Sequence, residues 1–90
     1  MRLERDRTLP YVVHPELMDD YRACMTPARL KVCRAFLGGI KLRREYGRVL
    51  YDVTWHAGGD YGTVSSLSLR LAIDVAVGEI DKRVPAGVGL

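Results

Sequence analysis

The chain of 90 residues has no long hydrophobic run. It contains only two cysteines, two histidines, one tryptophan and one phenylalanine. A transmembrane helix needs about 20 consecutive apolar residues, and no stretch of the sequence approaches that length. The charged start, residues 1–7, is followed by no apolar segment of the kind that a secretory signal carries. We therefore expect a soluble, cytoplasmic protein that does not insert into a membrane.

The scarcity of cysteine and histidine bears on disulfides and metals. Cys24 and Cys33 are too few for a fold built on disulfides. Their spacing matches no common zinc-binding pair, and adding His14 and His56 supplies no close pair of ligands on a turn. We expect both cysteines as buried thiols on apolar helical stripes, with oxidation to a disulfide left open. We predict no metal and no cofactor.

The composition is that of one small globular domain. Hydrophobic residues make up 48% and charged residues 28% of the chain, which is typical of folded proteins. A chain of this length has room for one core, which excludes a multidomain enzyme. We divide it into an edge strand or extended arm at 1–13, a compact domain at 14–83 and a tail at 84–90. The tail is apolar and rich in glycine, which suits docking on a partner or the cut end of a longer chain.

Two N-terminal helices are predicted from start signals and apolar periodicity. His14 and Pro15 open the first, because proline at the first helical position loses no hydrogen bond, and apolar residues recur at helical spacing to about residue 25. Thr26 and Pro27 suit the N-cap and the first turn of the second helix.

Two adjacent glycines leave two alternative positions for the end of the second helix. Gly38 and Gly39 each cost a helix about 1 kcal/mol relative to alanine. The helix therefore either ends at Leu37 or continues through a weak joint to Tyr46. We favour continuation, because apolar and basic residues keep their helical phase beyond the glycines.

A strand is predicted at residues 48–56, where apolar and polar side chains alternate with a period of two. The glycines of residues 57–62 then mark a turn or a mobile loop. Residues 67–83 fit both a strand and a helix. We favour a helix capped by Ser65 or Ser66; as a strand, the segment would pair with residues 48–56 in a hairpin.

The fold class that follows is α+β: a small single domain with two N-terminal helices, a short antiparallel strand or hairpin, and a C-terminal helix. So small a sheet depends on helix packing or on a partner. An unpaired sheet edge leaves homo-oligomerisation open.

The positive charge is concentrated in residues 29–48, where Glu45 is the one acidic residue, whereas the rest of the chain is net negative. On a continuous helix, several of the cations would lie along one exposed stripe. The candidate residues for binding nucleic acid or an acidic partner are Arg29, Lys31, Arg34, Lys41, Arg43, Arg44 and Arg48.

A concentrated basic face attracts phosphate backbones. We expect a small non-enzymatic module that binds nucleic acid with little sequence specificity, since no base-reading motif accompanies the cations. Tyr46 and Tyr51 suit stacking on bases, although Tyr51 is expected in the core. A second hypothesis is an adaptor or inhibitor that docks on an acidic or nucleic-acid-binding protein surface, or an accessory domain of a larger complex. A solvated helix face without a partner explains the same charges.

Catalysis has less support. His56 and Asp60 flank the glycine turn, and a histidine beside a carboxylate can act as a general acid or base. No nucleophile motif, phosphate loop or paired metal ligands accompany them. A polar loop tip is the simpler interpretation, so we predict no catalytic residue and no enzymatic activity.

Overall fold

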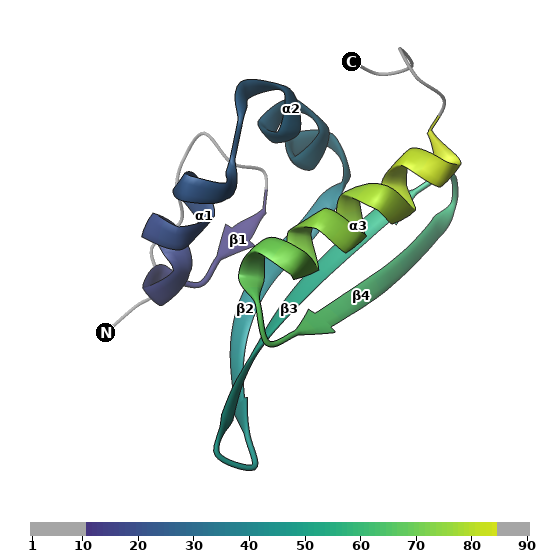
Figure 1. The fold of residues 1–90 in the computed structure, drawn as a ribbon. Helices are drawn as coiled ribbons and strands as arrows, with labels where there is room; N and C mark the ends of the chain where they lie inside the picture. The colour runs from purple at the N-terminus through teal and green to yellow at the C-terminus, as the bar shows by residue number, and fades with distance from the viewer. Residues whose placement is uncertain (1–10, 85–90) are drawn as a thin grey trace.

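A four-stranded sheet carries its helices on one face in the computed structural model, which describes residues 11–84 (Figure 1). The elements run in the order β1 (Val12–Val13), η1 (Pro15–Leu17, a 3-10 turn), α1 (Met18–Cys24), α2 (Pro27–Phe36), β2 (Leu37–Glu45), β3 (Arg48–Ala57), β4 (Asp60–Ser66) and α3 (Leu69–Arg83). The predicted α+β class, with N-terminal helices, a sheet and a C-terminal helix, is confirmed. Of the predicted arm and tail, residues 1–10 and 85–90 lie outside the described part of the chain.

The strands lie in the order β1-β2-β3-β4. β1 pairs with β2 in parallel, whereas β2 with β3 and β3 with β4 are antiparallel. The two-residue strand β1 lies at one edge of the sheet. It is held by Tyr11, whose buried hydroxyl is hydrogen-bonded to that of Tyr21 in α1.

The two N-terminal helices begin where local signals predict. Pro15 occupies the first turn of η1, which leads directly into α1. The Thr26 hydroxyl accepts a hydrogen bond from the backbone N–H of Arg29 at 3.1 Å and so caps α2. These starts depend on contacts within three residues, which is why the sequence alone predicts them.

The predicted continuation of the second helix to Tyr46 is wrong. α2 ends at Phe36, Leu37 is extended (φ −89°, ψ 144°), and β2 begins there. Two adjacent glycines weaken a helix at this point, and the extended chain gains a ladder of hydrogen bonds with β3 instead. It also places Leu37 and Ile40 in the core.

The predicted strand is confirmed as β3, and two of its apolar residues, Val53 and Trp55, are buried. The glycine segment is a tight turn at Gly58 and Gly59, both with positive φ, and it leads into β4, which the sequence analysis did not predict as a strand. A hairpin therefore exists, but residues 60–66 rather than 67–83 supply its second strand.

Residues 69–83 form the favoured helix, so the strand alternative for this segment is wrong. Its cap is Ser68, whose hydroxyl accepts from the N–H of Leu71 at 3.2 Å, while Ser65 and Ser66 belong to β4. α3 lies across β3 and β4 and buries its apolar side against them. The buried residues of α3 are Leu69, Ala72, Ile73, Ala76 and Ile80. Within residues 11–84, none of the helices has the length and apolarity to cross a bilayer.

Candidate functional site

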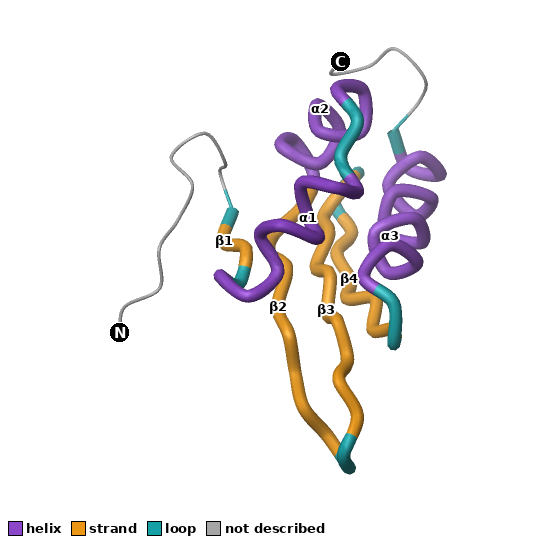
Figure 2. The backbone as a smooth tube through the Cα atoms, turned by 60° about the vertical axis from the view of Figure 1, so that its left-hand side comes forward, coloured by secondary structure: helices purple, strands orange, loops and turns teal. Residues whose placement is uncertain are grey.

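The β2–β3 hairpin extends beyond the rest of the sheet and the helices (Figures 1 and 2). β4 reaches β3 only as far as Tyr51, and β1 pairs with β2 only at Gly39 and Ile40. Beyond these points β2 and β3 pair with each other alone, through Arg43↔Leu50, Arg44↔Val49 and Glu45↔Arg48. We call residues 43–50 the β-ribbon.

The tip of the β-ribbon is a two-residue turn of Tyr46 and Gly47, with φ of 51° and 74°. Such turns favour asparagine or aspartate before glycine, because both residues take left-handed conformations. For a bulky residue this conformation costs about 1–2 kcal/mol. Tyr46 is nevertheless 91% exposed. An aromatic ring is therefore presented to solvent at a conformational cost, and backbone outliers of this kind cluster at functional positions.

Cations lie on both faces of the β-ribbon. Residues that alternate along a strand point to opposite faces, so Arg43 lies on the face away from the helices and Arg44 on the helix side. Arg44 Nη2 reaches Glu16 Oε2 of η1 at 3.2 Å. Arg48 is exposed and has no ion pair with any described residue; the same holds for Lys41, just below the β-ribbon.

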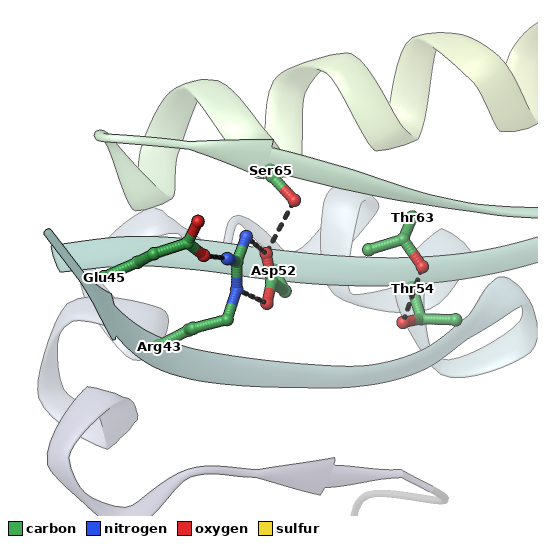
Figure 3. Close-up of polar contacts among 6 residues, drawn as sticks. All are labelled: Arg43, Glu45, Asp52, Thr54, Thr63 and Ser65. Carbon is green, nitrogen blue, oxygen red and sulfur yellow. Dashed lines mark hydrogen bonds and ion pairs between the residues drawn. The ribbon is translucent and has the colours of Figure 1, made fainter.

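Arg43 belongs to a polar network on the open face of the sheet (Figure 3). Its Nε lies 3.0 Å from Asp52 Oδ2, and its Nη1 pairs with Glu45. The Ser65 hydroxyl donates to Asp52 Oδ1 at 2.6 Å, so the network spans β2, β3 and β4. The hydrogen bonds from Arg43 and Ser65, with the nearby Arg43 and Lys41 charges, hold the pKa of Asp52 below its usual value. Arg43 is thus fixed in place by two carboxylates.

The remaining predicted cations lie on α2, at the end of the molecule opposite the tip of the β-ribbon (Figures 1 and 2). Arg29 is paired with Asp74 of α3, with Nη2 2.6 Å from Oδ1. Lys31 and Arg34 are exposed. The predicted single helical stripe is therefore wrong: the seven cations are divided between α2 and the β2–β3 hairpin, because the helix ends at Phe36.

His56 and Asp60 do not form an acid–base pair in the structure. His56 lies opposite Tyr61 in the register, and Asp60 lies opposite the following residue of β3, so their side chains leave opposite faces of the sheet. The Asp60 carboxylate accepts from Arg83 Nε at 2.9 Å. A shallow depression of about 350 Å³ is shared by both residues. The Asp60 carboxylate is therefore bound to Arg83 and not to His56.

The described residues contain no cluster of three or more histidine, cysteine, aspartate or glutamate side chains that could hold a metal ion. Cys24 and Cys33 are buried and carry free thiols. Burial raises the pKa of Cys33 to about 11.

Sequence reasoning identified Tyr46 but placed it within a helix. A tyrosine is unusual in the left-handed position of a turn, and this masked the hairpin signal in the Tyr46-Gly47 pair. The sequence did not single out Tyr61 either. Its side chain is exposed on the open face of the sheet, where Tyr61 is paired with His56 across β3 and β4.

Comparisons with protein-family models, with curated proteins and with solved structures find no match to this chain. Its function is therefore argued from the geometry of the described residues.

Proposed function

We propose that this chain is a non-enzymatic module that binds nucleic acid with little sequence specificity, and that the β-ribbon is its binding element. The observation that carries the proposal is the combination found at residues 43–50. Three arginines and a solvent-exposed tyrosine lie on one projecting two-stranded segment.

The size of the β-ribbon fits this role. Three residue pairs at about 3.4 Å per residue extend about 10 Å beyond the sheet. The major groove of B-DNA is about 12 Å wide and 8.5 Å deep, and it admits a two-stranded ribbon. The segment is therefore long enough to reach the bases, while its width suits the groove.

The charge distribution supports contacts with the backbone. Arg48, which has no ion pair with any described residue, lies on one face of the β-ribbon and Arg44 on the other, so a strand of phosphates on either side meets a cation. The Arg44–Glu16 pair has side chains 66% and 56% exposed. An ion pair in water is worth less than about 1 kcal/mol, so Arg44 can exchange its carboxylate partner for a phosphate.

The tip supplies a second mode of contact. Stacking of an aromatic side chain on an unpaired base is worth about 1–3 kcal/mol and tolerates any base. Tyr46 is exposed enough for its ring to stack in this way. Phosphate contacts and stacking are both indifferent to sequence, which is why we propose low specificity.

The proposal is tested by fluorescence anisotropy with labelled random-sequence double-stranded DNA, single-stranded DNA and RNA at several salt concentrations. We expect binding at low salt that weakens steeply as salt rises, because each neutralised phosphate releases counterions. The double variant Arg44→Glu/Arg48→Glu should lower the affinity at least tenfold. It should also reduce the slope of log K against log salt by about 2.

The matched control is Lys31→Glu/Arg34→Glu, which makes the same change in net charge on exposed residues of α2. We expect it to have a clearly smaller effect. Equal losses from the two variants would show that net charge alone drives binding, and would overturn the assignment to the β-ribbon. Absence of binding to all three nucleic acids at low salt would overturn the proposal, and would leave an acidic protein surface as the partner to test.

A further inference from the structure

The outer edge of β4 is a second surface of interest. Within residues 11–84, β4 pairs with β3 alone, so the backbone groups on its other side meet no strand. Natural sheets protect such edges with charged residues, proline or bulges. Residues 61–66 contain no charged residue and no proline, and their register with β3 is regular. This edge is therefore open to a further strand.

An apolar side of α3 borders this edge. Leu71 and Val75, one helical turn apart, are 54% and 44% exposed. Arg83, which binds Asp60 at the start of β4, marks the β4 side of α3, whereas Asp74, which binds Arg29, marks the α2 side. At about 100° per residue, Val75 lies on the β4 side of the helix and Leu71 at the outer border of that side, away from the sheet.

We propose that this combined surface binds a second copy of the chain, with the two β4 strands pairing antiparallel about a two-fold axis. An axis near Thr63 or Val64 places Asp60 opposite serine in the other copy, so no like charges meet. Residues of one face remain on that face, because antiparallel pairing preserves the alternation of the strand. The edge is thus complementary to itself.

The position of α3 favours a second copy over an unrelated strand. α3 packs over both β3 and β4, so the two copies of α3 would lie about two strand spacings apart, or about 10 Å. Packed helices lie about 8–10 Å apart. Pairing of the strands therefore brings Leu71 and Val75 of both copies into contact. A bare strand from another protein would leave these side chains in water.

The test is sedimentation equilibrium of the full chain between about 1 µM and 1 mM, a range that covers standard binding free energies of about −8 to −4 kcal/mol. We expect the mass to rise from that of the 10.1 kDa monomer to twice that value. Leu71→Glu/Val75→Glu should keep the protein monomeric with an unchanged far-UV circular dichroism spectrum, because both residues are exposed. Arg70→Glu, exposed on the other side of α3, is the control and should leave the association intact.

A second variant tests the strand edge itself. Thr63→Lys places like charges opposite or diagonal to each other across the axis, and should weaken association at least tenfold. A monomer at all concentrations would overturn the proposal. So would a dimer whose mass is insensitive to both variants, since its interface would then lie elsewhere. Because the β-ribbon lies apart from this edge, either result leaves the nucleic-acid proposal to its own test (Figure 1).

Discussion

Gly62 lies directly opposite Trp55 in the β3–β4 pair, and the indole ring occupies the space that a side chain at position 62 would need. A Cβ at this position would lie 2.9 Å from the Cζ2 atom of the indole. The ring is only 6% exposed and also carries the Arg83 guanidinium, whose Cζ lies 4.6 Å from its centroid. The glycine is therefore required by a cross-strand contact and not by the backbone conformation.

The first prediction follows from this contact. Gly62→Ala should destabilise the protein by about 1–3 kcal/mol, because the indole must shift within a packed core. Urea denaturation followed by tryptophan fluorescence measures the change in the free energy of unfolding.

Gly78→Ala is the control for this substitution. Gly78 lies within α3, and apart from the backbone of its own helix and its chain neighbours, a Cβ there would meet no atom within 4 Å. The change should stabilise the protein by about 0.5–1 kcal/mol, since alanine is the better helix former. Equal effects of the two substitutions would contradict the cross-strand explanation.

The second prediction concerns the tip of the β-ribbon. Tyr46→Asn should stabilise the protein by about 1 kcal/mol, because asparagine tolerates the left-handed conformation better than tyrosine does. The same variant should bind single-stranded nucleic acid more weakly, as it lacks the ring that stacks on bases. Thermal unfolding and fluorescence anisotropy measure the two effects.

Tyr46→Phe separates the ring from the turn. It keeps the aromatic surface and should retain most of the affinity. If Tyr46→Asn binds as tightly as the original protein, stacking at the tip is wrong, whatever the change in stability.

The third prediction is a pH dependence at Asp52. Its pKa is lowered in the folded protein by hydrogen bonds from Arg43 and Ser65 and by the Arg43 and Lys41 charges. The carboxylate therefore contributes stability above its unfolded pKa of about 4, and this contribution is lost as the pH falls through the lower folded value. Asp52→Asn should cost about 1 kcal/mol at pH 7.

The difference in unfolding free energy between Asp52→Asn and the original protein should shrink steadily below pH 4. Urea titrations at pH 7, 4 and 2.5 provide the comparison. A difference that is the same at all three pH values would mean that the network contributes through packing and not through its charge.

The fourth prediction concerns thiol reactivity. Cys33 is fully buried and its pKa is raised to about 11 by that burial, so the thiolate is scarce at neutral pH. In the folded protein it should react with a thiol reagent far more slowly than in denaturant, where both cysteines become accessible. The variant Cys24→Ser provides the assignment, because Cys33 is then the one cysteine of the chain. Rapid modification of Cys33 in the folded state would contradict its burial.

The elements that the sequence predicts well are those with local start signals. Pro15 and Thr26 act within their own first turn, so no distant residue is needed to place the helix. The alternation of residues 48–56 likewise belongs to the strand itself. The position of α3 was predicted within two residues, although its cap is Ser68 and not an earlier serine.

β2 and β4 depend on partners far along the chain. Residues 37–45 place Leu37 and Ile40 at a spacing that suits a helix, and pairing with β3 selects the extended form. Apart from Val64, β4 shows little alternation of apolar and polar residues. Its strand conformation follows from its pairing with β3 and from the contact of Gly62 with Trp55.

By itself the sequence determined the α+β class, the starts of the helices, the main strand and the concentration of cations between residues 29 and 48. These depend on composition and on contacts within a few residues. The tertiary structure alone decided that the cations divide between α2 and the β-ribbon, and that Tyr46 stands at an exposed tip. The physical reason is that a strand becomes stable only when its backbone hydrogen bonds find another strand, and that pairing sets which side chains meet.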